Sequence, residues 1–401
     1  MSLRLGICGV GAFADCFIPL FRAHPLVGEV ILCDLDADKL RTKSERFGLP
    51  STCPSLDDLC ALDIDAIAII TQHWLHAPQA VQALKAGKHV YSAVPTAHSL
   101  DELTELVRTV AQTGRVYMLG ETSYYYPCAI YCRRRYQAGD FGRAVFGEAE
   151  YYHDWDHGLY DVAKWRGGKD WRKWAGGPPM YYPTHSTSLI ISVTGAHMTH
   201  VSCFGVVDDH EDGLYRPGAN VYDNLFSNES ALFRMSDGSL SRINEFRRIG
   251  HPGTVRMSLH GTLGSYEEQA NGSVWVTKNP AETLDLTDLL ACRGVPAAEV
   301  AGDMAKVTSA DGTHSGASRV HDLARLPREF IGLPNGHNGS HQFLVDDFVQ
   351  ACVEGALPPN NVWQAARYMV PGLIAHESAK LGGQLLEIPD FGDPPPEQLG
   401  A

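Results

Sequence analysis

The first 120 residues place a glycine-rich turn in a setting that strongly limits the fold. Gly9-Val10-Gly11-Ala12-Phe13-Ala14 follows an apolar run, Leu3–Cys8, and precedes a helical segment that extends to about Arg22. Apolar runs and helical patterns then alternate. The runs are Val27–Asp34, Ile64–Ile70, His89–Ser92 and Val116–Leu119, and the helical patterns are Asp36–Phe47, His76–Ala86 and Leu100–Thr113. This alternation predicts βαβ units and a doubly wound parallel sheet, which is an α/β fold.

The turn has a physical role in such a sheet, because it would hold the phosphates of a dinucleotide. Gly9 permits the tight turn, Gly11 lets the backbone approach a pyrophosphate, and Ala14 allows close packing of helix on strand. We therefore predict that residues 9 and 11–14 (Gly9, Gly11, Ala12, Phe13 and Ala14) bind the cofactor. Asp34 ends the next strand, where its carboxylate would accept the ribose hydroxyls and repel a 2′-phosphate. That favours NAD over NADP. The alternatives are a turn without a ligand and a strand-end cap at Asp34.

Composition excludes several classes of protein. A chain of 401 residues predicts two or three domains, and its net charge of −14 argues against nucleic-acid or anionic-membrane partners. No run approaches ~18 apolar residues, so no membrane span is predicted. The N-terminus has no secretory pattern, and the ten cysteines are scattered without metal-site spacing. These features predict a cytoplasmic protein with reduced thiols.

The segments Ile64–Thr71 and Ala83–Val90, with His76 between them, resemble the Gfo/Idh/MocA oxidoreductases. The resemblance implies a Rossmann domain over residues 1–122. It also implies an α/β domain over 123–385 with an open, mostly antiparallel sheet that binds substrate and mediates a homodimer or homotetramer. Helices at about 341–381 would pack back on the first domain, and 386–401 would be a tail.

Two departures from the family's dehydrogenases concern the reacting hydroxyl. Those enzymes carry Glu-Lys-Pro after the strand that corresponds to His89–Ser92, and the lysine helps to polarise the hydroxyl. This chain carries Ala93-Val94-Pro95. Tyr181 stands where the dehydrogenases carry an aspartate four residues before a catalytic histidine, which is His185 here. Two of three dehydrogenation residues are therefore missing.

The altered pattern is similar to the NAD-dependent glycoside hydrolases of this family, of the α-N-acetylgalactosaminidase and sulfoquinovosidase type. The matching pieces are Val94-Pro95, Tyr182–His185, Thr71–His76 with Trp74, Glu121–Tyr125, Tyr151–Asp154, Gly261–Tyr266 and Gly336–Gly339. Ala93 departs from the glutamate of that branch. Besides the glycine turn and Asp34, the predicted cofactor-binding residues are Thr71, Trp74, His76, Val94, Pro95 and Glu121.

The resemblance implies a hydrolysis with no net redox change. The C3 hydroxyl of the sugar is transiently oxidised, the C2 proton is removed, the C1 substituent leaves, water adds and C3 is reduced again. We predict that His185 takes the C3 hydroxyl proton, because imidazole titrates nearest neutrality. Tyr125, Tyr181 and Tyr182 are candidates for removing the C2 proton or for assisting the leaving group, and the first of these roles requires a lowered phenol pKa. The alternatives are a helix cap at His185 and tyrosines of the core.

One basic, aromatic stretch predicts the substrate. Residues 164–174 hold five cations and three tryptophans, and arginine suits anionic oxygens. The predicted substrate-binding residues are Lys164, Trp165, Arg166, Arg172, Arg247, His153 and His337. An anionic sugar such as a sulfoquinovoside would fit, and the alternative is a solvated loop. His153–His157 looks like a metal cluster, but we favour a polar substrate wall or a solvated loop and predict no metal.

Two other functions remain open from the sequence. One is an NAD-linked sugar or polyol dehydrogenase that uses His185 with substitute partners. The other is a non-catalytic dinucleotide-binding sensor, since the dehydrogenase lysine is lost. In each enzymatic case the partner is a small-molecule sugar or glycoside.

Overall fold

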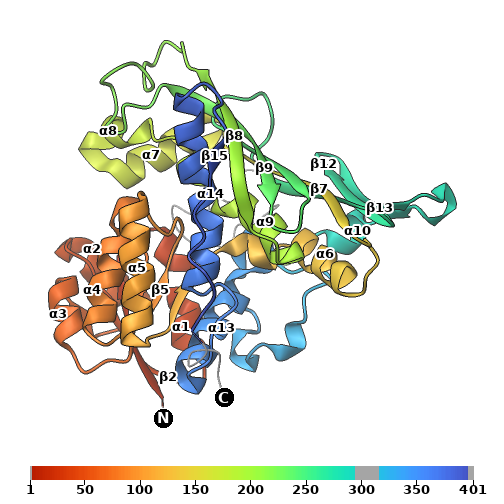
Figure 1. Cartoon of the computed structure of the whole chain (residues 1–401). Helices are drawn as coiled ribbons and strands as arrows, with labels where there is room; N and C mark the ends of the chain where they lie inside the picture. Colours follow the sequence, from red (N-terminus) through yellow and green to blue (C-terminus); the bar gives the residue numbers. More distant parts are fainter. Residues whose placement is uncertain (1, 294–315, 396–401) are drawn as a thin grey trace. The chain divides into compact units, whose positions relative to one another are not determined.

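The computed structural model describes residues 2–293 and 316–395 (Figure 1). The chain forms two compact units. Unit 1 comprises Met1–Tyr126, Ala291–Ala366 and Phe391–Ala401, and unit 2 comprises Pro127–Leu290 and Arg367–Asp390. The stretch Ala291–Ala366 thus belongs to the first unit, although the sequence analysis assigned it to the second domain.

Unit 1 contains the predicted doubly wound sheet, which is confirmed. Its order is β3-β2-β1-β4-β5-β6 and every pair is parallel. The strands are β1 Leu3–Cys8, β2 Val27–Cys33, β3 Thr52–Cys53, β4 Ala66–Ile69, β5 His89–Ser92 and β6 Tyr117–Leu119. The helices between them are α1 Ile18–Ala23, α2 Ala37–Phe47, α3 Leu56–Ala61, α4 His76–Lys85 and α5 Leu100–Thr113. Reversal of strand order beside β1 puts its carboxyl end at the position where such sheets bind ligands.

Local chemistry explains several of these helix ends. Asp36 and Ser99 cap α2 and α5 by accepting a backbone N–H in the first turn. Gly48 and Gly114 end the same helices in left-handed conformation, which glycine adopts without strain. The segment after the glycine turn is less regular than expected, since a short 3₁₀ turn, Phe13–Cys16, precedes α1.

The C-terminal part of unit 1 completes its core. Helix α13, His341–Glu354, buries Phe348 against Phe21 of α1, with ring centroids 6.3 Å apart. His24 at the end of α1 lies 3.2 Å from the carboxylate of Asp346. The apolar face of α13 is therefore the physical reason why this late segment folds with the first 126 residues.

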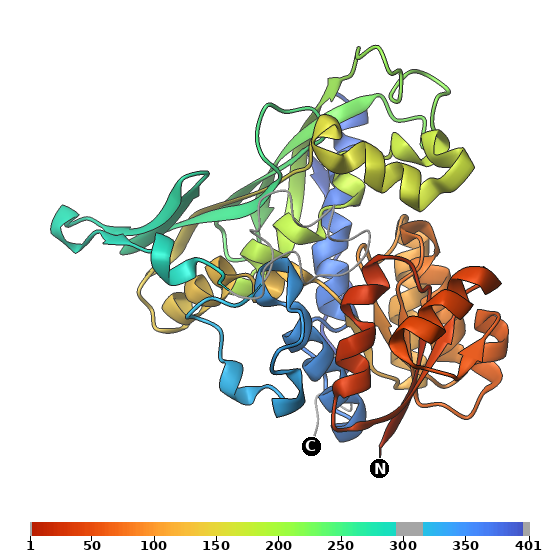
Figure 2. The same cartoon turned by 180° about the vertical axis from the view of Figure 1, so that it is seen from behind.

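Unit 2 contains the predicted open, mostly antiparallel sheet, which is also confirmed. Its order is β14-β13-β12-β11-β7-β10-β9-β8-β15. Among the described strands of this sheet, β7 and β10 pair in parallel and all other neighbours are antiparallel. The strands are β7 Ala144–Tyr152, β8 Met198–Val207, β9 Phe226–Met235, β10 Leu240–Phe246, β11 Thr254–Gly261, β12 Gly264–Gln269, β13 Gly272–Thr277, β14 Leu284–Asp285 and β15 Leu386–Glu387. Helices α6, Pro127–Gln137, and α9, Thr184–Thr194, lie along this sheet (Figures 1 and 2).

The end of the chain differs from the expected tail. Leu386–Glu387 forms β15 on the edge of the unit 2 sheet, and Ile388 is buried. Residues 396–401 lie outside the described part. The remaining helices used below are α7 Tyr160–Gly167, α8 Trp171–Ala175 and α14 Val362–Lys380, with a 3₁₀ turn at Pro179–Tyr181. No helix in the described ranges is long and apolar enough to cross a membrane.

Candidate active site

The glycine turn of unit 1 has a geometry that suits a dinucleotide. Gly9 has φ of +89°, and a Cβ there would lie 2.6 Å from the carbonyl oxygen of Ile70, so no other residue fits. The amides of Gly11 and Ala12 donate to no acceptor within the part of the chain that the structure describes. Amides of such a turn that have no protein acceptor are ready donors for phosphate oxygens, so these residues fit the cofactor that the sequence predicts.

Asp34 is tied to the turn by its carboxylate. One oxygen accepts the amide of Val10 at 3.0 Å and the other accepts the amide of Asp36 at 2.9 Å. Lys39 lies 3.6 Å from the second oxygen. Asp34 therefore shapes the turn as well as offering its remaining lone pairs, and its predicted contact with the ribose stays a prediction.

The two predicted cofactor loops of unit 1 meet at His76. Its Nδ1 lies 3.0 Å from the carbonyl oxygen of Pro95, and its Nε2 lies 3.2 Å from that of Thr71. The ring is buried. His76 thus braces the Thr71 loop against the Val94–Pro95 loop. A brace of this kind positions a cofactor site, whereas a direct contact of His76 with the cofactor stays a prediction. Trp74, in the same loop, packs edge-on against His73 and is half-buried.

Glu121 and Tyr125 follow β6 in unit 1. Glu121 is fully buried and accepts the amide of Ser123 at 2.9 Å. The Tyr125 hydroxyl donates to Asp347 and accepts from Arg325 at 2.9 Å. Burial, followed by the charge of Asp347, raises the pKa of Tyr125 far above its ordinary value. A base role needs the opposite direction, so the raised pKa argues against Tyr125 as a base, and its part in assisting the leaving group stays a prediction.

The structure brings His337 to the glycine turn. Its ring lies 5.7 Å from that of Phe13, and its Nδ1 lies 2.9 Å from Nε2 of His341. Burial lowers the pKa of His341 to about 3, so this partner is neutral. The predicted contact of His337 with the substrate stays a prediction, and its ring lies beside Phe13 of the glycine turn, which is itself predicted to bind the cofactor.

His185 is the centre of an aromatic cluster in unit 2. It lies in the first turn of α9, after Pro183, and its side chain is buried. Its ring lies 5.3 Å from Tyr151, edge to face, and 5.4 Å from Tyr182. The residue at the helix N-cap is Pro183 and no side chain caps α9, so the alternative of a capping His185 is not observed.

Tyr151 is a residue of this cluster that the sequence analysis did not assign. Its hydroxyl lies 2.9 Å from Nδ1 of His153, so the predicted His153 reaches the cluster through it. Burial raises the pKa of Tyr151. The signal available in the sequence was its place in the Tyr151–Asp154 motif on a strand, but a strand alone does not say which aromatic faces a site.

Tyr181 contacts a different set of residues in unit 2 from those around His185. Its ring lies 5.2 Å from His376 of α14, edge to face. Burial, followed by the charges of Glu377 and Glu229, raises the pKa of Tyr181 to about 12. The raised pKa argues against Tyr181 as a base, and its part in assisting the leaving group stays a prediction.

Arg247 was predicted to bind substrate, and the structure corrects this. The side chain is buried under the ring of Tyr151, at 4.7 Å from its centroid. Its guanidinium donates to Glu245 at 3.0 Å and to the carbonyl oxygens of Tyr151, Phe246 and Pro179. These four acceptors occupy the fork, so Arg247 supports the cluster from within.

The basic stretch is divided between two neighbourhoods. Arg166 of α7 is exposed, with its guanidinium 5.9 Å from the ring centroid of Tyr182. Lys164 lies over Tyr160 and Trp171, and Arg172 donates to the carbonyl oxygen of Asp212. Trp165 is exposed. Arg166 is thus the predicted cation that the described contacts connect to the His185 cluster.

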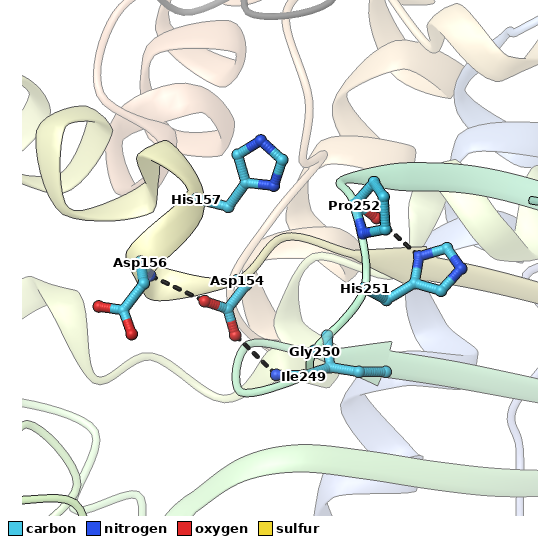
Figure 3. A pocket seen from close by; sticks show the side chains of 7 residues that line it. All are labelled: Asp154, Asp156, His157, Ile249, Gly250, His251 and Pro252. Atoms are coloured by element: carbon cyan, nitrogen blue, oxygen red, sulfur yellow. Dashed lines mark hydrogen bonds between the residues drawn. The ribbon is translucent and has the colours of Figure 1, made fainter.

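From the His153–His157 stretch, Asp154, Asp156 and His157 line a surface pocket of about 330 Å³ together with residues 249–252 (Figure 3). Asp154 lies between the two segments and accepts the amides of Asp156 at 2.8 Å and Ile249 at 2.6 Å. Within the described ranges, no group of three or more His, Cys, Asp or Glu is arranged to hold a metal ion. Asp154 therefore joins two loops in this structure.

Two family models match the chain. Residues 3–121 match the "Oxidoreductase family, NAD-binding Rossmann fold", and residues 130–267 match the "GFO/IDH/MocA C-terminal domain". The chain belongs to the Gfo/Idh/MocA oxidoreductase family. It is accordingly an NAD-dependent enzyme of oxidoreductase fold.

The chain is also similar to individual proteins of known name or structure. A glycosyl hydrolase family 109 protein of Streptomyces niveus is 26% identical over 97% of this chain and 77% of its own length. One from Saccharopolyspora erythraea is 24% identical over 97% of this chain and 83% of its own. Among solved structures, levoglucosan dehydrogenase in complex with NADH is 16% identical, covers 98% of this chain and 100% of its own, and has a TM-score of 0.74. That likeness shows the shared fold.

Proposed function

We propose that this Gfo/Idh/MocA protein is an NAD-dependent glycoside hydrolase that acts through transient oxidation at C3 of a sugar. The observation that carries the proposal is His185, buried in a cluster of tyrosines, in a chain where Val94 stands at the family's lysine position. A dehydrogenase without lysine or aspartate lacks two groups that stabilise the charged alkoxide. The similarity to glycosyl hydrolase family 109 proteins over 97% of the chain supports the same assignment.

The chain's own residues would bind, orient and move protons. Bound NAD⁺ supplies a hydride acceptor for C3 and, as NADH, the donor that restores it. His185 takes the proton of the C3 hydroxyl and returns it in the last step. Oxidation at C3 acidifies the C2 hydrogen, and loss of that proton expels the C1 substituent. Water addition then completes the hydrolysis without net redox change.

We assign the C2 proton to Tyr182. It is the predicted tyrosine whose ring packs directly on His185, at 5.4 Å between centroids. Tyr125 and Tyr181 are not assigned to this step because their pKa values are raised. Tyr151 and His153 form a hydrogen-bonded pair beside His185 that would orient the imidazole and the sugar.

We further propose that the sugar carries an anionic group such as a carboxylate or sulfonate, as in a sulfoquinovoside. Arg166 is an exposed cation placed over Tyr182, which itself contacts His185. A guanidinium fork matches the paired oxygens of such a group. The oxidised and reduced sugars stay in place between steps, so an anchoring charge pair would also hold the intermediate.

The decisive experiment incubates the protein with aryl glycosides and follows aglycone release and NADH absorbance together. We expect release without net NADH. Stoichiometric NADH would instead identify a sugar or polyol dehydrogenase, and neither signal would identify a dinucleotide-binding sensor. A substrate deuterated at C2 should exchange its label with solvent, and full retention of deuterium would remove the elimination.

The variant Arg166→Gln tests the anionic substrate. We expect kcat/KM for an anionic aryl glycoside to fall about 10–100-fold, because one charge-assisted hydrogen-bonded pair is lost. The neutral counterpart should change less than about threefold. Lys169→Gln, an exposed cation of the same stretch, is the matched control. Equal losses for both substrates would contradict the role of Arg166.

We also propose a cytoplasmic homo-oligomer. All ten cysteines are free thiols, and β8 presents Phe204 and Val206 to solvent from unit 2. Exposed apolar residues of this kind mark association surfaces. Light scattering of the purified protein should give a mass of two or four chains, and a monomer at micromolar concentration would contradict the proposal.

A further inference from the structure

Two buried glutamates face each other beneath the segment that carries the proposed catalytic residues. Glu229 of β9 and Glu245 of β10 are direct cross-strand partners, and both are fully buried. Directly opposed residues on antiparallel strands point to the same face, with Cβ atoms roughly 5 Å apart. Burying two carboxyl groups side by side is costly unless each is hydrogen-bonded or paired. Such a pair therefore requires an explanation in its surroundings.

Each glutamate reaches the segment Pro179–Ser186. One oxygen of Glu229 accepts the amide of Met180 at 2.9 Å, and the other lies 2.7 Å from Nδ1 of His376. One oxygen of Glu245 accepts the hydroxyl of Ser186, and the other accepts from Arg247 at 3.0 Å. Glu229 thus holds the start of the segment and Glu245 holds its end.

Arg247 adds a third attachment to this segment. Its guanidinium donates to the carbonyl oxygen of Pro179 while it pairs with Glu245 and lies over the ring of Tyr151. The segment between these attachments contains Tyr181, Tyr182 and His185. The positions of these three side chains therefore depend on polar groups that lie beneath them.

We propose that Glu229 and Glu245 are positioning residues that fix Pro179–Ser186 and so aim Tyr182 and His185, with Glu245 also setting the charge beside His185. The proposal rests on the proposed function, because it assumes that His185 transfers a proton. Neither glutamate touches the sugar or the cofactor in this account.

The charge beside His185 follows from the groups around Glu245. These are Arg247 directly after the same strand, Glu229 on β9, Tyr151 on β7, and Ser186 and His185 on α9. Burial raises the pKa of Glu245 to about 7, and Arg247, Ser186 and His185 act in the lowering direction. Glu245 therefore changes charge near neutral pH, within electrostatic reach of His185.

The activity test compares substitutions that keep or remove the hydrogen bonds. In Glu229→Leu and Glu245→Leu we expect kcat to fall about 100-fold with KM and NAD affinity within about threefold, because small displacements of reacting groups have effects of this size. Glu229→Gln and Glu245→Gln keep an acceptor and should recover about tenfold of that loss. In a plot of kcat/KM against pH, the inflection near pH 7 should shift to a different pH in Glu245→Gln.

Glu268 supplies the matched control. It is another glutamate of unit 2 whose pKa desolvation raises to about 7, but it is only partly buried and accepts the amide of Met257 on β11. Glu268→Gln should leave kcat, KM and the pH profile unchanged. A Glu245→Leu protein that is folded and keeps native kcat would overturn the proposal.

Two measurements without substrate keep this test separate from the proposed function. Hydrogen exchange followed by mass spectrometry should show peptides covering residues 179–186 exchanging about tenfold faster in Glu229→Leu and Glu245→Leu, but not in Glu268→Gln. The infrared carboxyl band lost in Glu245→Gln should titrate at higher pH in His185→Gln, because His185 lowers that pKa. Unchanged exchange and an unchanged band would overturn the positioning role even if glycosidase activity is found.

Discussion

The variant His185→Ala is expected to lower aryl glycoside turnover by about 10³-fold and to leave NAD affinity unchanged. General acid–base catalysis by a positioned imidazole contributes ~10²–10⁴-fold. His185 lies in unit 2, against Tyr151 and Tyr182, whereas the glycine turn belongs to unit 1. Its removal therefore takes away the group that accepts the C3 hydroxyl proton without touching the turn. Steady-state kinetics and NAD titration by fluorescence would measure both quantities.

His260→Ala is the control for this substitution. His260 is a histidine of the same unit, on β11, stacked against Phe146 rather than against the His185 cluster. Its removal should change turnover less than about threefold. Full turnover in His185→Ala would remove this residue from the mechanism. A loss of NAD affinity would instead assign it a part in binding.

The variant Arg247→Met is expected to destabilise the protein by about 3–5 kcal/mol at neutral pH. Removing one member of a buried pair leaves the other either as an uncompensated charge or as a carboxyl that must hold a proton, and losses of this size are typical in proteins. Here the remaining group is Glu245, fully buried on β10. The carbonyl oxygen of Pro179 also loses the hydrogen bond that Arg247 donates to it. Urea unfolding followed by tryptophan fluorescence would measure the loss.

The loss in Arg247→Met should depend on pH. Glu245 holds its proton more tightly in the folded state, since its pKa is raised from 4.5 to about 7, and Arg247 opposes that rise. Stability from this group falls as pH rises through that interval, because unfolding then releases a proton. Without Arg247 the pKa rises further, so the loss should be larger at about pH 8 than at about pH 5.

A second substitution makes the explanation testable. In Arg247→Met with Glu245→Gln, no buried charge is left alone, and we expect roughly half or more of the lost stability to return. A double variant no more stable than Arg247→Met would show that packing of the guanidinium, rather than its charge, supports the cluster.

Sequence patterns predicted the parts of this protein whose physics is local. The alternation of apolar runs and helical patterns in the first 120 residues predicted the parallel sheet. Buried parallel strands are continuous apolar runs, and glycines end the helices between them. The turn at Gly9 was predictable because positive φ and close backbone approach exclude other residues. The motif matches also placed the chain in its family, which the family models confirm.

The sequence patterns did not predict the burial and the partners of individual polar side chains. Arg247 looks like a substrate ligand in sequence because arginine binds anions, yet a buried strand end turns it inward to Glu245. Tyr125 and Tyr181 look like candidate bases, but burial raises their pKa values, helped by the charge of Asp347 at Tyr125 and those of Glu377 and Glu229 at Tyr181. The opposed pair Glu229 and Glu245 lies 16 positions apart in sequence, and only strand register makes it a pair.

The amino-acid order alone determined the Rossmann sheet, the dinucleotide turn and the family, because each depends on residues close together in the chain. Tertiary structure decided which polar side chains are available to a substrate and which are buried and position other residues. Burial, charge and partners fix that distinction through desolvation and pairing, and these depend on residues such as Arg247, Asp347 and His376 that distant segments bring into contact.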